Sequence, residues 1–211
     1  MTQNTLIHKI KNLQKSDVKI TITKRIAEFK RIGKSSDNEI FKELCFCLLT
    51  ANYDAKKAIN IQQKMGNVFL IPDLEIIRSN LKLLGYRFPN VRAKYIFLAQ
   101  QHKDGIREII NDNKNDSSNL RQWFVNNIKG LGYKESSHFL RNIGFLDYAI
   151  LDFHIIDILN KNGVIKRPKT LTPPKYIEIE DKLKYFSNEL DLQLGELDFY
   201  LWYLEVGEIF K

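Results

Sequence analysis

The sequence has little cysteine, and its metal-binding residues are few. The only two cysteines among 211 residues, Cys45 and Cys47, alternate within a stretch that reads as a helix. Alternate positions point to different sides of a helix, so a disulfide between them is not expected. Zinc sites and iron–sulfur clusters usually need four ligands, and the four histidines show no metal-binding spacing. We therefore expect core cysteines and no metal.

Long apolar runs and an excess of acidic residues are also missing. No stretch reaches the length of a membrane-spanning helix, and residues 1–20 lack the apolar centre of a signal peptide. Asp and Glu total 25 against 33 Lys and Arg, which leaves a formal charge of +8. Such an excess favours polyanionic partners such as DNA, RNA or anionic membrane surfaces. We expect a cytoplasmic protein, associated with the nucleoid if its partner is DNA.

Helical periodicity runs almost throughout the chain, whereas strand-like alternation is short. Ser36 and Glu39 have the spacing of a capping box ahead of a strongly apolar helix. Asp54, Pro72 and Pro89 stand where further helices are expected to begin. The pattern predicts an all-α protein of about a dozen short helices, the last two over residues 175–189 and 193–206.

Residues 128–154 are the most informative stretch. Gly130 and Gly132 separate two helical patterns, Lys134 follows, and Asp152 lies eighteen residues further on (152 − 134 = 18). Glycines allow a tight turn and a close approach to a partner, because they carry no Cβ. The helix start behind the turn presents unpaired N–H groups, which suit phosphate oxygens. The lysine is then either one more cation or, coupled to the aspartate, a nucleophile.

This order of hairpin, lysine and aspartate resembles the helix-hairpin-helix DNA glycosylase superfamily, and most closely its archaeal-type 8-oxoguanine DNA glycosylase/AP lyases. Five segments carry the resemblance: FKELCFCLLTAN (41–52), LGYRF (84–88), NIKGLGYKESSHFLRNIG (127–144), AILDFHI (149–155) and LGELDFYLWYLEVG (194–207). The resemblance implies two helical lobes with the helix-hairpin-helix motif (about 119–143) at their junction and the active site in the cleft between them. One lobe is expected to comprise residues 36–146, and the other residues 1–35 plus 147–211.

The resemblance also implies a catalytic pair. Lys134 is expected to attack the sugar C1′ of the damaged nucleotide, to form a Schiff base, and so to permit strand cleavage by β-elimination. Asp152 is expected to stabilise the positive charge that builds on the deoxyribose as the base leaves. Taken alone, Lys134 reads as a solvated helix residue and Asp152 as an N-cap, and the N-cap role is compatible with catalysis. Phe153 stands where a basic residue is expected in close relatives.

Three further groups of residues are expected to contact DNA. Lys129, Gly130 and Gly132 are assigned to a phosphate. Phe88 and Trp202 resemble the pair that sandwiches a flipped base, next to Lys211, whose ammonium and terminal carboxylate are both available to the base edge. Asn52 and Arg87 resemble the residues that fill the vacated stack and contact the opposite base. The plainer alternatives are a core tryptophan, a capping asparagine, a surface arginine and a solvated chain end.

The expected function is a base excision repair enzyme for 8-oxoguanine in duplex DNA, acting as a monomer without cofactor or membrane. Three alternatives stay open. The same scaffold could act on another lesion, because pocket residues set the choice of substrate. A non-catalytic helix-hairpin-helix module would grip the DNA backbone but would need neither Lys134 nor Asp152. An RNA-binding protein would explain the charge but leave the lysine–aspartate pair without a role.

Overall fold

A computed structural model describes residues 3–211, and within that range the protein contains helices and no strand. Residues 3–211 form twelve α-helices and two short 3₁₀ helices, which confirms the predicted all-α class. In chain order the elements are α1 (Gln3–Leu13), α2 (Asp17–Gly33), α3 (Asp37–Thr50), α4 (Ala55–Met65), η1 (Gly66–Leu70), α5 (Leu74–Leu83), α6 (Pro89–Ala99), η2 (Gln100–Gly105), α7 (Ile106–Asn113), α8 (Ser117–Asn127), α9 (Tyr133–Asn142), α10 (Phe153–Lys161), α11 (Pro173–Glu189) and α12 (Leu194–Val206).

Most helix starts follow local chemistry. The Asp54 carboxylate accepts a hydrogen bond from the backbone N–H of Lys57 at 2.8 Å and caps α4. Pro89 occupies the first turn of α6, where its missing N–H has no helical partner to lose. Pro72 does not open a helix itself, since α5 is capped by Asp73 and begins one residue later. The helix start expected directly after Pro72 is therefore confirmed to within one residue, with the aspartate side chain as its cap.

The capping box predicted at the start of α3 is wrong in its side chains. Ser36 is the N-cap residue by backbone conformation, but its hydroxyl makes no cap hydrogen bond. The Glu39 carboxylate instead pairs with the Lys42 ammonium at 2.7 Å, three residues along the helix. The ion pair on the helix surface draws the glutamate away from the backbone N–H that a capping box requires.

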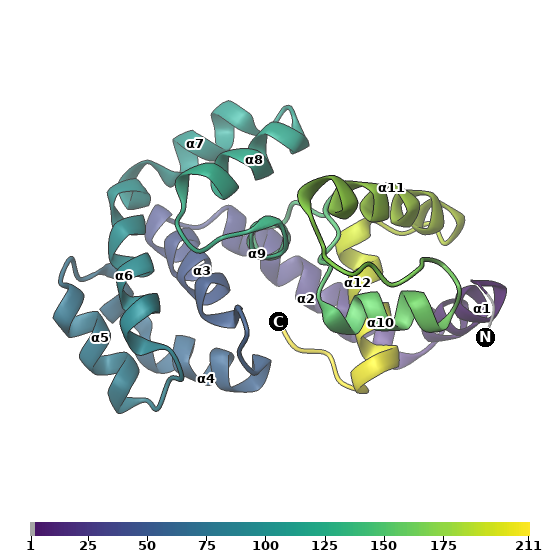
Figure 1. The fold of residues 1–211 in the computed structure, drawn as a ribbon, viewed down its shortest axis with the longest axis horizontal. Coiled ribbons are helices and arrows are strands. Elements are labelled where there is room, and N and C mark those ends of the chain that lie inside the picture. The colour runs from purple at the N-terminus through teal and green to yellow at the C-terminus, as the bar shows by residue number, and fades with distance from the viewer. Residues whose placement is uncertain (1–2) are drawn as a thin grey trace.

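The buried apolar side chains form two clusters. The first is built by α3 to α9, and the second by α1, α2 and α10 to α12. In Figure 1 helices α3 to α8 lie to the left of α9, which is seen almost end-on, and α1 and α10 to α12 lie to its right, while α2 passes behind it. Ile32 on α2 packs against both clusters. We refer to the two groups as the first and second lobes. The residue boundaries predicted for them, 36–146 against the remainder, stay a prediction.

Helix α3 is the central element of the first lobe. Residues 43–50 are all buried, including Cys45 and Cys47, which are free thiols. Burial raises the pKa of both thiols well above the ordinary value, so each behaves as an apolar side chain. The prediction of core cysteines without a disulfide is confirmed.

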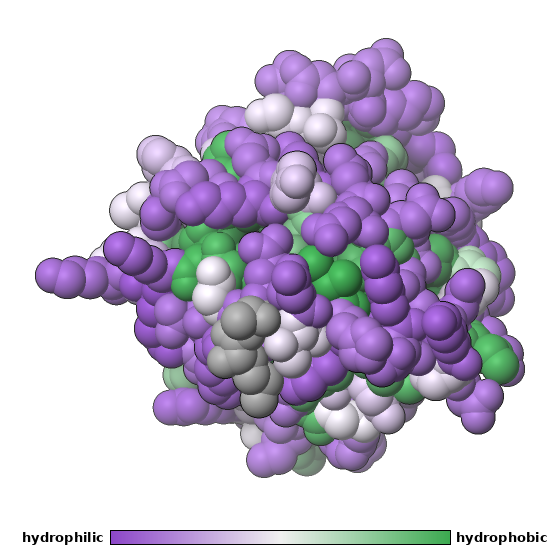
Figure 2. Space-filling view, turned by 90° about the vertical axis from the view of Figure 1, so that its right-hand side faces the viewer, coloured by the Kyte–Doolittle hydropathy of each residue, from purple (hydrophilic) through white to green (hydrophobic). Residues whose placement is uncertain are grey.

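The surface of the second lobe is largely hydrophilic in the view of Figure 2, where apolar side chains lie in small patches between charged ones. None of the helices in residues 3–211 combines the length and the hydropathy needed to span a bilayer.

Candidate active site and nucleic-acid interface

The hairpin between α8 and α9 is a tight turn that depends on Gly130. The N–H of Leu131 donates to the carbonyl of Ile128 at 3.1 Å, and Gly130 has a φ of +98°. A Cβ at this position would lie 2.3 Å from a ring carbon of Tyr95 on α6. Both the backbone conformation and the close packing therefore require glycine here.

Gly132 has a different role in the same hairpin. It is the N-cap residue of α9, with an extended backbone (φ −94°, ψ −169°) that any residue can adopt. A Cβ built there would meet only the Glu135 carboxylate, at 3.5 Å. The fold does not require glycine at this position, so a side chain here would extend into the space in front of the hairpin. Lys129, on the same turn, is exposed.

Lys134 is the second residue of α9, directly behind the hairpin. Its side chain is 22% exposed, and its ammonium lies 3.8 Å from the Glu135 carboxylate. Lys134 is thus largely removed from water at the start of the helix behind the hairpin, where the sequence places the nucleophile.

Asp152 caps helix α10. Its carboxylate accepts a hydrogen bond from the N–H of Ile155 at 2.9 Å, so the N-cap role expected from the sequence is confirmed. The neighbouring Phe153 side chain is 64% exposed. The position where a basic residue was expected thus presents an apolar ring to solvent, directly beside a candidate catalytic carboxylate.

Lys134 and Asp152 both act electrostatically on a third residue, Asp198. Asp198 on α12 is buried, and burial is the main reason that its pKa rises to about 6. The Arg141 and Lys134 cations lower the pKa of Asp198, whereas the Asp152 charge raises it. Both candidate catalytic residues are therefore close enough to Asp198 to act on its ionisation, although they come from different helices and lie far apart in the chain.

Asp198 is one end of a buried polar chain that the sequence analysis missed. Arg141 binds both Asp198 and the side-chain oxygen of Asn142, the latter at 3.1 Å through Nε. The Asn142 amide donates to Glu43 on α3 at 2.7 Å, and Glu43 in turn binds the Lys211 ammonium. The signal that could have found it is a charge inside an apolar run, at Glu43 and again at Asp198, because isolated charges are rarely buried without partners.

The C-terminal segment crosses from the second lobe to the first. The Lys211 ammonium hydrogen-bonds to Glu43 and, at 2.8 Å, to Gln62, and it lies 4.7 Å above the Phe46 ring. In Figure 1 the C-terminus lies between α12 and the helices of the first lobe. The prediction that the Lys211 ammonium is available to a base differs from this arrangement, because buried Glu43 on α3 and half-buried Gln62 on α4 already hold it.

His138, one turn after Lys134 on α9, contacts the same chain end. Burial, and then the charges of Arg141, Lys134 and Lys211, lower the pKa of this imidazole well below its ordinary value. A hydrogen bond to the Lys211 backbone partly offsets that effect. The histidine is thus held neutral among three cations.

Phe88 and Trp202 lie in different lobes. Phe88 packs against the first cluster, with the Arg87 guanidinium 4.8 Å above its ring. Trp202 packs against the second, with His154 at 5.0 Å and Phe210 at 6.1 Å between ring centroids. Among residues 3–211 no ring contact joins Phe88 to Trp202. A base held by both rings would therefore be contacted by both lobes.

Asn52 and Arg87 are both exposed, on neighbouring segments. Asn52 follows α3 in the left-handed conformation (φ +57°), which asparagine tolerates after a helix. Two contacts hold its segment against the one that carries Arg87: Arg92 donates to the Ala51 carbonyl at 2.9 Å, and the Tyr86 hydroxyl donates to the Leu49 carbonyl at 2.7 Å.

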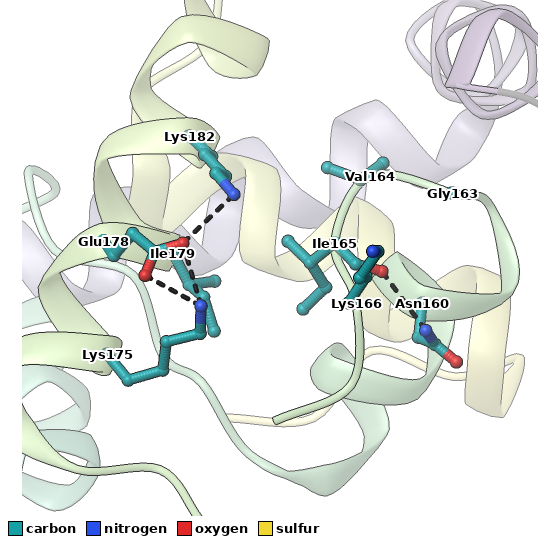
Figure 3. Close-up of a pocket in the computed structure, with 9 residues that line it drawn as sticks. All are labelled: Asn160, Gly163, Val164, Ile165, Lys166, Lys175, Glu178, Ile179 and Lys182. Atoms are coloured by element: carbon teal, nitrogen blue, oxygen red, sulfur yellow. Dashed lines mark hydrogen bonds and ion pairs between the residues drawn. The ribbon is translucent and has the colours of Figure 1, made fainter. Parts of the chain in front are cut away.

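Two cavities lie away from all of these residues. One of about 640 Å³ opens between α10 and α11 (Figure 3). Lys175 and Lys182 reach into it but are paired with Glu178, at 2.7 and 3.1 Å. The other, of about 380 Å³, lies against α2, α7 and the end of α9. Neither is lined by a residue assigned to the site. In residues 3–211 no group of three or more His, Cys, Asp or Glu side chains is arranged to hold a metal ion.

An all-α fold with a glycine hairpin between two packed helices defines the helix-hairpin-helix class. Residues 22–192 match the family model described as "8-oxoguanine DNA glycosylase". An "8-oxoguanine DNA glycosylase/AP lyase" of Methanocaldococcus jannaschii is 48% identical over 207 residues, covering 98% of this chain and 99% of the relative. The chain therefore belongs to the 8-oxoguanine DNA glycosylase family.

Solved structures agree with this assignment. The M. jannaschii 8-oxoguanine glycosylase/lyase in complex with a 15mer DNA containing 8-oxoguanine matches with a TM-score of 0.94 at 47% identity, over 98% of this chain and 100% of the other. The 8-oxoguanine DNA glycosylase of Thermotoga maritima matches with a TM-score of 0.92 at 33% identity, over 99% and 100%.

Proposed function

We propose that this protein excises 8-oxoguanine from duplex DNA and then cleaves the strand at the resulting abasic site. It acts as a monomer on chromosomal DNA in the cytoplasm, without a cofactor. The observation that carries the proposal is the placement of Lys134 and Asp152. In a chain of this family, a largely desolvated lysine directly behind the hairpin and a capping aspartate both lie within electrostatic range of Asp198.

The chemistry begins at the Lys134 amine. Attack of neutral Nζ on the sugar C1′ forms a C–N bond and breaks the bond from C1′ to the base, whose nitrogen takes the bonding electrons and a proton. Positive charge builds on the sugar during this step, and the Asp152 carboxylate stabilises it. The sugar ring opens to a protonated Schiff base, loss of a C2′ proton follows, and the 3′ phosphate is expelled in the β-elimination.

Recognition of the lesion requires the base to leave the duplex, since its glycosidic bond is otherwise out of reach. In this proposal Phe88 and Trp202 stack on its two faces and draw the lobes together. Lys211 lies beside the base in this proposal, with its ammonium held by Glu43 and Gln62. Asn52 and Arg87 occupy the vacated stack and contact the opposite base, while Lys129 and the hairpin N–H groups bind a phosphate.

Borohydride trapping tests the proposal. Wild-type protein is incubated with duplexes that contain 8-oxoguanine, hypoxanthine, uracil or no lesion, and borohydride is added to reduce any Schiff base to a stable amine. We expect a covalent adduct with the 8-oxoguanine duplex. Lys134→Gln should abolish both the adduct and strand cleavage, because it removes the nucleophile.

Lys129→Gln is the matched control, since it removes a nearby exposed lysine from the same motif. It should still trap, while binding all duplexes somewhat less tightly. If an adduct formed only with another lesion, the Schiff-base reaction would be supported, but that lesion and not 8-oxoguanine would be the substrate. Binding without any adduct would identify a non-catalytic DNA-binding protein.

A further inference from the structure

The segment that leads into Asp152 has no secondary structure, so its backbone groups need partners from elsewhere. Tyr176 on α11 supplies two of them. Its buried hydroxyl donates to the Ala149 carbonyl at 2.6 Å and accepts from the N–H of Leu151 at 3.2 Å. One side chain therefore holds the two residues on either side of Ile150, just before the candidate catalytic aspartate.

The same tyrosine also contacts the helix that carries Lys134. Its hydroxyl lies 3.3 Å from the Ser137 hydroxyl on α9, and its ring packs against Tyr133 at 5.5 Å between centroids. Tyr133 and Ser137 bracket Lys134 in the sequence. Tyr176 thus touches α9 on both sides of the nucleophile and, at the same time, the segment that ends at Asp152.

Glu180, one turn further along α11, anchors this arrangement to the hairpin. Its carboxylate accepts from the N–H of Ala149 at 2.9 Å and binds both terminal nitrogens of Arg121 on α8, at 2.6 and 2.9 Å. Both side chains are only 3% exposed. Burial alone would lower the pKa of Arg121, but the hydrogen bonds and charge of Glu180 raise it. The ion pair ties α11 to α8, the first helix of the hairpin motif.

We propose that Tyr176 is a positioning residue for base excision: its hydroxyl fixes the segment 149–151, and so Asp152, at a set separation from Lys134 on α9. Tyr176 itself touches neither the DNA nor the reacting atoms. Its effect arises because a misplacement of about 1 Å at a reacting centre can cost on the order of 100-fold in rate. The inference rests on the proposed function, because it assigns Lys134 and Asp152 to one reaction.

Tyr176→Phe tests the proposal, since it keeps the ring and removes only the hydroxyl. The single-turnover rate of 8-oxoguanine excision at saturating enzyme should fall by about 10- to 100-fold, as is usual when a group behind a catalytic residue is lost. The dissociation constant for the 8-oxoguanine duplex should stay within about twofold, because no DNA contact changes. Cleavage of a preformed abasic site should fall much less, because no base has to leave and Lys134 is unaltered.

Tyr200→Phe is the matched control. Tyr200 is a buried tyrosine on α12 whose hydroxyl has no hydrogen-bond partner, so its removal should leave the excision rate unchanged. Two measurements separate positioning from folding: the fraction of each variant that borohydride traps on a preformed abasic site, and the melting temperature.

Positioning is supported if Tyr176→Phe is trapped as fully as wild-type protein but excises 8-oxoguanine slowly, while Tyr200→Phe excises it at the wild-type rate. Excision at the wild-type rate in Tyr176→Phe would overturn positioning, and so would an equal loss of excision and elimination that follows a reduced trappable fraction. If wild-type protein itself excises nothing, the proposed function fails, and this outcome is distinct from either of those.

Discussion

In the proposed function, Asp152 combines a structural and a chemical role in one side chain. The hydrogen bond to the N–H of Ile155 holds the carboxylate at the start of α10, which restricts its rotamers and so places the charge. A catalytic group that is also a cap needs little further support to stay oriented. The backbone that leads into the aspartate must also be held in place, and the hydrogen bonds of residues 149–151 to Tyr176 and Glu180 do this.

Asp152→Asn separates the two roles, because asparagine caps helices about as well as aspartate. The melting temperature should change little, whereas the rate of 8-oxoguanine excision should fall by at least about 100-fold, since the stabilising charge is lost. Single-turnover excision and thermal denaturation measure the two effects. If excision persisted at unchanged stability, the role would have to pass to another carboxylate. Asp147, which is exposed, and Asp157, which is paired with Arg167, are the two nearby in sequence.

Asp198 makes stability depend on pH. Because burial raises its pKa to about 6, the folded state holds a proton that the unfolded chain releases near pH 4. The stabilisation from Asp198 is therefore complete below about pH 4 and is lost as the pH rises to about 6. Urea denaturation at several pH values should show this decline in wild-type protein. In Asp198→Asn it should be absent, and an identical pH profile in the two proteins would remove Asp198 as its source.

The hairpin shows that two glycines in one motif can be required for different reasons. Gly130 is fixed by a positive φ and by contact with Tyr95, both of which belong to the fold. Gly132 meets neither condition, and in the proposed function the close approach of a DNA phosphate is what would exclude a side chain there. The spacing Gly-x-Gly predicts the turn, but it cannot separate these two causes.

Gly132→Val should therefore fold normally and bind DNA weakly. We expect a near wild-type melting temperature and weaker binding to duplexes of any sequence, because in the proposed function the hairpin contacts phosphate and not bases. Gly130→Val is the contrasting variant, and it should lose stability through strain and a clash with Tyr95. Fluorescence anisotropy with damaged and undamaged duplexes measures binding. A Gly132→Val protein that lost only its preference for the lesion would contradict the assignment.

Helices and their ends were largely predictable because their causes are local. Asp54 and Asp152 cap the helices that follow them, and Pro89 begins α6, as the sequence indicates. The exception is the capping box predicted for Ser36 and Glu39, which does not form because Glu39 pairs with Lys42 on the surface of the same helix. The candidate catalytic pair was also visible in the sequence, through its position relative to the hairpin. The residues that surround this pair were not visible, because Glu43, Tyr176 and Asp198 meet only once the chain has folded.

The two lobes are joined by buried polar links as well as by α2 and α9. Arg121 and Glu180 connect α8 to α11, while Arg141 and Asp198 connect α9 to α12. The C-terminal segment adds a third link through Lys211 and Glu43. Such ion pairs depend on geometry, since a buried charge without its partner is costly. They fix one arrangement of the lobes where apolar packing alone would tolerate several.

Extension of the chain beyond Lys211 by a short peptide tests the role of this terminus. The ammonium can still reach Glu43, but the added residues occupy the space beside it. We expect 8-oxoguanine excision to fall clearly and elimination at a preformed abasic site to be much less affected, because only the first requires a base to be held. Glu208→Gln is the control, since it removes an exposed ion pair with Lys56 in the same segment. Unchanged excision in the extended protein would return Lys211 to a purely structural role.

The partition of the core also gives the protein one spectroscopic reporter for each half. The only two tryptophans divide between the clusters, Trp123 against the first and Trp202 against the second, and both thiols lie in the first. Fluorescence of Trp123→Phe and Trp202→Phe variants therefore follows each half separately. The rate at which a thiol reagent modifies Cys45 and Cys47 follows transient opening of the first half alone. Because buried charges span the junction, we expect both fluorescence transitions to coincide, and thiol modification to be limited by global unfolding.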